Sequence, residues 1–473
     1  MQSRSAHSTE GGSAIQELVD AVRNWPLSYP ARQVRNLLFR PHSIAIVDQL
    51  VVSGASFATT ILIGQAAGAA ELGAYAIAAS VFASLMSVQN ALILQPFAIQ
   101  LHRMNYAGQA HAGAAFALSC GFAILASGLT ALAAAAGFLL PGGHSEFVGL
   151  GLALAPVLPF ILGREFVRRF LFARLRVSTA LTIDVAVSAI QVGGLVALAR
   201  WDHLNAASAC LCLGFACCAP AFAWLVAAGK DFQFNRARFV DTARESWTLG
   251  KWLLLGQVTV QIQAYGAYWL IMGIGGPMIT GVFAACTSIV GFVNPLLFGA
   301  ANVLTPKQAL AWRTDGSLGL LREAVRNALL LGGMTGAFCA VILLGGNQLL
   351  QLLFRSAEFT GHGHVVVVLA FATFTTAVGM PASNALAAMD RPRAIVAVGG
   401  IGSIVTILAI TVLMQRWGVV GAAYGGLAGS AVGAIGRWLA FLAVVDREHS
   451  KLRSITMHSR RPDVWQRIVI WYN

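Results

Sequence analysis

Polar side chains recur at helical spacing in two apolar stretches that are each long enough to cross a membrane. They form two stripes, Gln49, Ser53, Ser56 and Thr60 in the first, and Gln257, Gln261, Tyr265 and Tyr268 in the second. Steps of three and four residues put each set on one face of a helix, and in lipid such a face must point into the protein. Amides, hydroxyls and aromatic rings supply the hydrogen bonds and stacking contacts that a sugar needs. The stripes predict the lining of a polar cavity, although polar contacts that join helices would use the same residue types.

Three more amide side chains extend this candidate lining. Gln89 and Asn90 lie in the span that follows the first stripe, and Asn294 lies in the span that follows the second. We expect them to face the same cavity.

Two carboxylates, Asp48 and Asp184, lie within predicted spans, each about a turn and a half from the cytoplasmic end. An unpaired charge at the middle of a bilayer costs at least ~2.5 kcal/mol, so both need a partner. Together they could share a proton or bind a coupling cation. A structural ion pair with Arg168, Arg169 or Arg437 is the alternative.

Five arginines are candidates for an anion site at the inner mouth: Arg103, Arg164, Arg168, Arg169 and Arg437. Guanidinium forks match the oxygens of a phosphate, and a diphosphate would suit several of them. Anchoring at the lipid headgroups would explain them as well. Arg437 is the most deeply placed of the five.

No motif in the chain indicates an enzyme. It contains no nucleophile elbow, no GxxxxGK phosphate loop and no HExxH metal motif. All seven cysteines fall inside predicted spans without a disulfide or metal spacing. We therefore expect no catalysis, no metal and no cofactor.

The composition excludes a soluble protein. Hydrophobic residues make up 57% and charged residues only 11%, with a mean hydropathy of +0.70. A water-exposed surface needs roughly 25% charge, and apolar runs of about 18 residues or more predict transmembrane helices. The chain is predicted to be an all-α polytopic membrane protein.

The net charge of +13 has a topological explanation. Nearly all Lys and Arg residues fall in alternate intervals between spans; only Arg200, Arg355 and Arg416 fall in the other set, and Arg437 lies within a span. This is the positive-inside pattern, which places both termini in the cytoplasm. It favours contact with anionic lipid and gives no reason to expect nucleic acid.

The spans are predicted to form two copies of a six-helix unit. A shift of 208 residues places Gln49 on Gln257 and Gly73 on Gly281, and fixed-period similarity indicates duplication. Two copies of a six-helix unit predict twelve transmembrane helices in two pseudo-symmetric lobes. The predicted divisions are a cytoplasmic segment with an interfacial helix (1–42), an N-lobe (43–229), a cytoplasmic linker (230–251), a C-lobe (252–445) and a cytoplasmic tail (446–473).

The sequence resembles the multidrug/oligosaccharidyl-lipid/polysaccharide (MOP) exporter superfamily, within it most of all the polysaccharide repeat-unit (Wzx-type) flippases. The resemblance covers about residues 43–445. It is carried by DQLVVSGASFATTILIGQAAGAAELGAYAIAAS from Asp48, REFVRRFLFARLR from Arg164 and WGVVGAAYGGLAGS from Trp417. It implies a MATE-like pair of lobes with alternating access, spans 1, 2, 7 and 8 around the cavity, and transport of an undecaprenyl-diphosphate-linked oligosaccharide across the inner (plasma) membrane.

The same resemblance implies partners and alternatives. The expected partners are the lipid-linked oligosaccharide, membrane lipids, and a polysaccharide polymerase with its co-polymerase. Asp48 and Asp184 resemble the proton or sodium site of the multidrug branch, so a MATE-type cation-coupled antiporter is the alternative, and a non-transporting scaffold for polysaccharide assembly is a third. One departure is that spans 1, 2, 7 and 8 carry no Lys or Arg at mid-depth.

Overall fold

The computed structural model describes residues 41–103, 108–139 and 145–459, and within them it is built from helices joined by short connections. The first half contains α3 (Pro41–Ala66), α4 (Gly68–Gln89), α5 (Gln95–Arg103), α6 (Gly108–Leu139), α7 (Ser145–Leu154), α8 (Leu158–Ala173), α9 (Val177–Arg200) and α10 (Ala206–Ala227). The second half contains α11 (Arg236–Gly291), α12 (Asn294–Phe354), α13 (Gly363–Ala388) and α14 (Pro392–Ser459). Three short turns complete it: the π-helix η1 (Asn90–Leu94) and the 3-10 turns η2 (Gly229–Asp231) and η3 (Ala357–Phe359). The all-helical prediction is confirmed.

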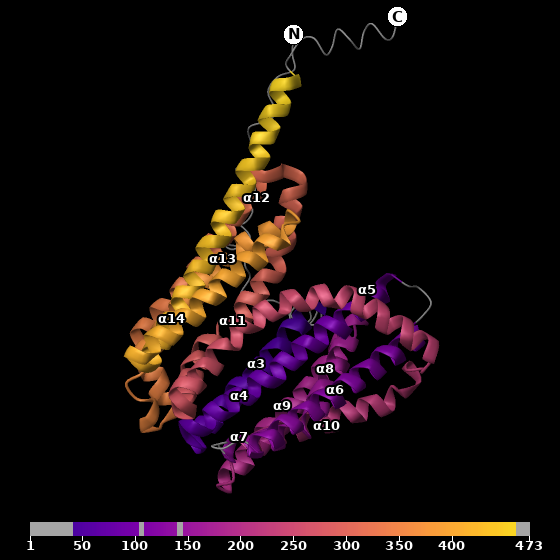
Figure 1. Cartoon of the computed structure of the whole chain (residues 1–473), viewed down its shortest axis with the longest axis vertical. Helices are drawn as coiled ribbons and strands as arrows, with labels where there is room; N and C mark the ends of the chain where they lie inside the picture. The colour runs from indigo at the N-terminus through magenta and orange to yellow at the C-terminus, as the bar shows by residue number, and fades with distance from the viewer. Residues whose placement is uncertain (1–40, 104–107, 140–144, 460–473) are drawn as a thin grey trace, which may run out of the picture.

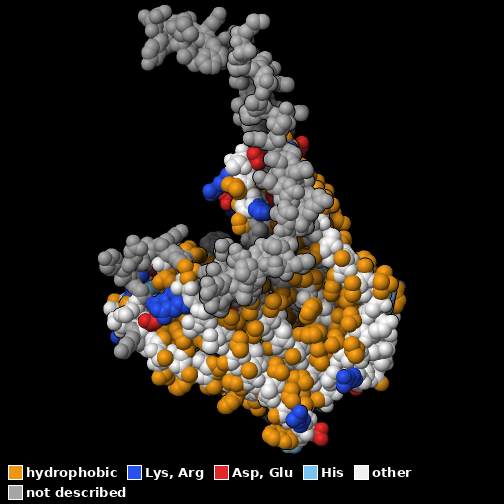
Figure 2. Space-filling view, turned by 180° about the vertical axis from the view of Figure 1, so that it is seen from behind, with side chains coloured by type: hydrophobic (Ala, Val, Ile, Leu, Met, Phe, Trp, Pro, Cys, Tyr) orange, Lys and Arg blue, Asp and Glu red, His pale blue; other side chains and the backbone are white. Residues whose placement is uncertain are grey.

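The helices have the length and composition of membrane spans. In the described part of the chain nine are long and apolar enough to cross a bilayer, or ten if the pair α7 and α8 forms one span bent by 44°. Pro156 lies in that bend and Pro159 starts α8, as expected of a residue that cannot donate the helical hydrogen bond. Figure 2 shows hydrophobic side chains spread over the described face, with few charged side chains, which lie near its top, its left edge and its lower end. This is a multi-pass membrane protein.

Three long helices are each divided by one glycine. Gly276 in α11 has φ 77°, Gly316 in α12 has φ 66° and Gly418 in α14 has φ 56°, all in the left-handed region that L-residues avoid. The sequence predicts spans 7, 8, 9, 11 and 12 at about residues 252–274, 279–303, 328–345, 395–414 and 419–444. The three glycines lie between spans 7 and 8, 8 and 9, and 11 and 12. The division of the chain into twelve spans, and the sidedness of its termini, stay predictions.

The helices form two bundles. Figure 1 shows α3 to α10 in one and α12 to α14 in the other, while α11 runs along the first before it joins the second. The predicted linker is therefore largely helical, since α11 begins at Arg236. Gln233 N–H donates to Gln109 O over 3.2 Å, which ties the start of this segment to α6.

The close approach of α4 and α11 depends on two glycines. A Cβ at Gly73 would overlap the carbonyl of Pro277, and a Cβ at Gly281 would overlap the carbonyl of Ala69. The two glycines also lie against each other, since a Cβ at Gly73 would be 2.8 Å from Gly281 N and one at Gly281 would be 3.0 Å from Gly73 N. Gly73 and Gly281 are the pair that the repeat shift superposes, so the contact has the reciprocal form expected of a pseudo-twofold axis.

Two predicted segments lie outside the described residues. The interfacial helix proposed within 1–42 falls almost entirely in residues 1–40, and the last part of the tail falls in residues 460–473.

Replacing Gly281 by Ala is expected to lower stability by about 1–3 kcal/mol, because the added methyl group has no space against the backbone of α4. The measurement is thermal unfolding of the detergent-solubilised protein. Gly273→Ala is the control on the same helix, where a Cβ would meet nothing within 4 Å. Equal melting temperatures for the two variants would contradict the contact.

Candidate functional site

A cavity lies between α4 and α11, and its lining combines polar and apolar residues. Its volume is about 240 Å³. It is lined on α4 by Ser84, Ser87 and Val88, and on α11 by Leu254, Gln257, Val258, Gln261, Ile262, Tyr265, Gly266 and Trp269. The helices that surround it belong to predicted spans 2 and 7, two of the four spans expected to line a cavity.

Close helix contacts bracket this cavity at both ends. Along α4 the cavity lies between the contact of Gly73 with Gly281 and a second contact, where a Cβ at Gly250 would lie 2.9 Å from the Cα of Leu92. Leu92 belongs to the π-helix η1. Between these contacts the serines of α4 face the amides of α11, and Gln261 Nε2 lies 3.4 Å from Ser84 Oγ. That long hydrogen bond leaves most of the donor and acceptor capacity of the lining to a ligand.

Three members of the second polar stripe line the cavity and the fourth does not. Gln257, Gln261 and Tyr265 are in the lining, whereas the ring of Tyr268 packs edge-on against Phe283 at 5.4 Å. Trp269, which is 51% exposed, takes the place predicted for Tyr268. The signal was in the sequence, because steps of four from Gln257 lead through Tyr265 to Trp269.

The first stripe does not contribute to this lining. Gln49 Nε2 donates to Ser53 Oγ over 3.2 Å, and the Thr60 hydroxyl donates to the carbonyl of Ser56 over 3.1 Å. The buried hydroxyl on α3 is instead that of Thr59, which accepts from Gln191 Nε2 at 2.8 Å.

The three added amides are also separate from the cavity. Gln89 is fully buried and donates to Ser119 Oγ over 2.6 Å and to Leu162 O over 3.1 Å. These are bonds that join helices within the first bundle. Asn90 is half-buried at the start of η1, and Asn294 is exposed at the start of α12.

The structure brings Asp48 and Asp184 together through arginines of α8. Arg168 donates from Nη2 to Asp48 Oδ2 over 2.7 Å and from Nε to Asp184 Oδ2 over 2.8 Å. Arg164 donates to the other oxygen of Asp184. Both carboxylates have no exposed surface. Two guanidinium groups therefore balance two carboxylates. This arrangement agrees with the second of the two hypotheses for Asp48 and Asp184, a structural ion pair.

This network limits what the carboxylates can bind. Arg168 binds one oxygen of each carboxylate, and Asp48 and Asp184 also lie close enough to interact directly with each other. Its guanidinium also lies over the ring of Phe172, 5.2 Å from the centroid. One oxygen, Asp48 Oδ1, is buried without a hydrogen bond to any described residue.

The five candidate arginines do not form one cluster. Arg169 is paired with Glu165 over 2.7 Å, and the side chain of Arg103 lies outside the described part. Arg437 lies in the second bundle, where a Cβ at Gly379 would be 3.5 Å from its Nη1. It has no ion pair with a residue that the structure describes, and its Nε is buried without a partner there.

Two hydrogen bonds join the bundles near the Gly73–Gly281 contact. Glu358, in η3 between α12 and α13, accepts from Ala69 N–H at the start of α4 over 2.7 Å. Gln65 Nε2 donates to Leu353 O over 2.6 Å. A carboxylate at a helix N-terminus is stabilised by the helix dipole, so Glu358 holds this end of the junction closed.

The arrangement of helices in two bundles is similar to solved structures of transporters of the MOP superfamily. No family model matches the sequence, and no curated protein is significantly similar to it. The similarity to known proteins is found among solved structures.

One similar structure is the inward-facing conformation of a multidrug resistance MATE family transporter, with a TM-score of 0.70, 17% identity, and coverage of 84% of this chain and 95% of that chain. An outward-facing conformation of such a transporter has a TM-score of 0.61 at 16% identity, covering 89% and 99%. The lipid II flippase MurJ in an inward closed conformation has a TM-score of 0.61 at 12% identity, covering 87% and 92%. The MATE-like fold is therefore confirmed.

Removing Arg168 is expected to destabilise the protein by about 3–5 kcal/mol, because Asp48 and Asp184 would lose the cation that joins them inside the bundle. Arg168→Ala is compared with Arg176→Ala in denaturant or thermal unfolding. Arg176 follows the same helix, is 56% exposed and lies 3.9 Å from the partly exposed Asp231, so its loss should cost less than about 1 kcal/mol. The additional change Asp48→Asn should recover part of the loss in the Arg168 variant. A network without structural importance would give equal stability to both single variants.

Proposed function

We propose that the protein is a flippase that moves an undecaprenyl-diphosphate-linked oligosaccharide repeat unit across the inner membrane for surface polysaccharide synthesis. The observation that carries the proposal is the distribution of charge and polarity. The cavity between α4 and α11 offers amides, hydroxyls and aromatic rings, which suit a glycan. Arg437, within a predicted span of the second bundle, has no acidic partner among the described residues, and we assign to it the anionic linkage of the substrate.

The charge network argues against a cationic substrate. Asp48 and Asp184 are already neutralised by Arg164 and Arg168, so they present no net negative charge to a cationic drug or a coupling ion. A MATE-type antiporter remains the alternative, because similar structures include multidrug resistance transporters and the carboxylates lie in predicted spans 1 and 5. A scaffold without transport activity is the third hypothesis for the function.

Alternating access follows from the contacts at the junction. A volume of about 240 Å³ is smaller than the roughly 300 Å³ at which pockets for drug-sized ligands begin, so a repeat unit requires α4 and α11 to separate. The Gly73–Gly281 contact and the Glu358 hydrogen bond close one end, and the contact of Gly250 with Leu92 closes the other. We infer that these ends open in turn. The partners of this reaction are membrane lipids and the polysaccharide polymerase with its co-polymerase.

Deletion of the gene is expected to leave the lipid-linked repeat unit on the cytoplasmic leaflet and to remove the surface polysaccharide. Leaflet-specific labelling of the glycan is the measurement. Unchanged surface polysaccharide with increased drug accumulation would support the antiporter instead. A scaffold would be indicated if purified protein in vesicles moved neither substrate.

Gln261→Leu is expected to reduce export by about tenfold or more, because it removes the amide from the cavity while keeping the size of the side chain. Export is measured as surface polysaccharide in cells that contain equal amounts of each variant. Gln49→Leu is the control, since it is the same substitution in the first polar stripe, at a residue that lies outside this cavity. A larger effect of Gln49→Leu would place the glycan elsewhere.

Arg437→Ala is expected to abolish export, and Arg437→Lys to restore part of it, because a lysine keeps the charge but loses the fork that fits a phosphate. The same export assay applies. Equal export by the wild type and both variants would remove Arg437 from the substrate site.

A further inference from the structure

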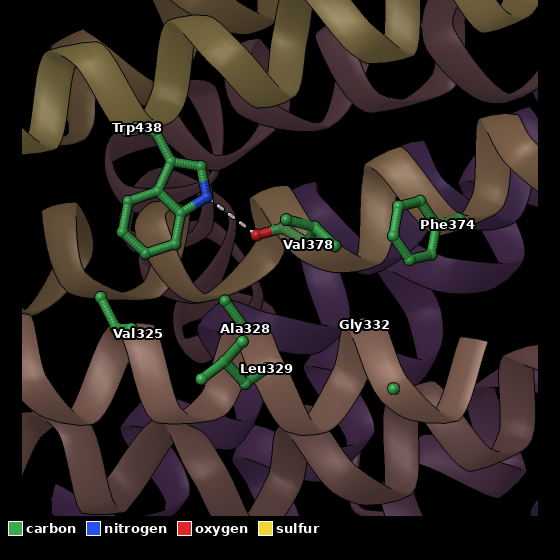
Figure 3. Close-up of a pocket in the computed structure, with 8 residues that line it drawn as sticks. Val325, Ala328, Leu329, Gly332, Phe374, Val378 and Trp438 are labelled. Atoms are coloured by element: carbon green, nitrogen blue, oxygen red, sulfur yellow. Dashed lines mark hydrogen bonds between the residues drawn. The ribbon is translucent and has the colours of Figure 1, made fainter. Parts of the chain in front are cut away.

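A second cavity lies within the other bundle, between α12, α13 and α14, and Figure 3 shows it from close by. Its volume is about 420 Å³. Every lining residue is apolar or glycine: Val325, Ala328, Leu329, Gly332 and Gly333 on α12, Phe374 and Val378 on α13, and Trp438 on α14. It shares no lining residue with the cavity between α4 and α11.

The hollow exists because two consecutive residues of α12 have no side chain. A Cβ at Gly333 would meet nothing within 4 Å, and a Cβ at Gly332 would meet only Val378 at 3.3 Å and Phe374 at 3.8 Å. The indole of Trp438 covers the opposite side, where its Nε1 donates to Val378 O over 3.0 Å. Since α12 packs mainly against α13 and touches α14 at few places, the cavity fills the gap that is left between α12 and α14.

The cavity is elongated along the helices. Val325 and Trp438 lie at one end in Figure 3, and Gly332 and Phe374 lie at the other. The eight-residue step from Val325 to Gly333 corresponds to about 12 Å along α12. This length is a substantial part of one leaflet of a bilayer.

The Val325 end of the cavity is close to cationic residues. Arg322 is exposed and lies one turn before Val325, and Arg326 follows it with a side chain that is 63% exposed. Arg326 is 4.0 Å from Glu323, the limit of an ion pair, and Arg322 has no ion pair within the described ranges. Both arginines belong to an interval that the positive-inside pattern assigns to the cytoplasm. The hollow therefore runs from a cationic end towards the middle of the membrane.

We propose that this cavity binds one acyl chain of an anionic phospholipid of the cytoplasmic leaflet, with the phosphate of the headgroup at Arg322 and Arg326. A dry, apolar hollow that opens within a bilayer has hydrocarbon as its natural occupant, because a gap without partner atoms loses dispersion contacts on all sides. The arginines select an anionic headgroup over a zwitterionic one, since basic residues at the cytoplasmic surface attract anionic lipid. The bound chain completes the packing of α12 against α14.

The test uses the full-length protein in nanodiscs of phosphatidylcholine with traces of a photoreactive lipid. The probes are phosphatidylglycerol and phosphatidylcholine with a diazirine in the middle of one acyl chain, and the labelled peptides are mapped by mass spectrometry. We expect the phosphatidylglycerol probe to label the peptides that contain residues 325–333 and 374–378. Gly333→Leu should reduce this labelling about tenfold by filling the hollow. Gly345→Leu is the control on the same helix, at a position that is also open.

The headgroup is tested separately. The double variant Arg322→Gln with Arg326→Gln should remove the preference for phosphatidylglycerol while the phosphatidylcholine probe still labels the cavity. Equal labelling of the wild type by both probes would overturn the proposal in favour of ordinary contact with bulk lipid. Displacement of the label by a polyprenyl phosphate, but not by unlabelled phosphatidylglycerol, would overturn it in favour of a site for an isoprenoid chain. Unchanged labelling of the Gly333→Leu variant would place the lipid elsewhere.

Discussion

The contact between α4 and α11 is the constraint on which the rest of this structure depends. It requires that Gly73 and Gly281 both lack a side chain, because each faces a backbone carbonyl of the other helix. The helices can then touch at this contact and at Gly250, and the polar side chains between the two points enclose a cavity. In a membrane, where the hydrophobic effect does not drive helices together, such backbone approach is a main source of association. The same contact joins the bundles, so separating it would be a movement of whole lobes.

The cost of charge in a low dielectric explains the difference between the two bundles. In the first, Arg164 and Arg168 are paired with Asp48 and Asp184, whose carboxylates have no exposed surface. In the second, Arg437 has no acidic partner among the described residues. An unbalanced guanidinium in a membrane span is stabilised by an anion, and a balanced network is not stabilised by a further cation. This asymmetry is why the proposed substrate carries a phosphate.

The bilayer also acts as a component of the fold. Leu329, which lines the α12 cavity, is 72% exposed, and the two glycines beside it leave a space that no side chain of the described residues fills. In water such a space would be a packing defect, whereas in a bilayer the acyl chain of a lipid can occupy it. In the proposed complex, the acyl chain of a lipid fills the space that the packing of the C-lobe leaves open.

The sequence by itself determined the class of fold and where its helices break. Length, hydropathy and the absence of charge predicted membrane spans, and the predicted connections fall at Gly276, Gly316 and Gly418, since a positive φ is a local property of glycine. The repeat shift also paired Gly73 with Gly281, which the structure brings into contact.

Only the tertiary structure decided which polar faces meet. Periodicity places residues on one face of a helix, but it does not say which neighbour covers that face or how far the helix is rotated. Gln49 and Gln257 are therefore equivalent in the repeat and different in their surroundings, and Trp269 rather than Tyr268 reaches the cavity. The partners of Asp48 and Asp184 could be reduced to a few arginines from the sequence. The choice of Arg168 and Arg164 came from the packing of α9 against α3 and α8, because the energy of an ion pair depends on a distance that sequence spacing does not contain.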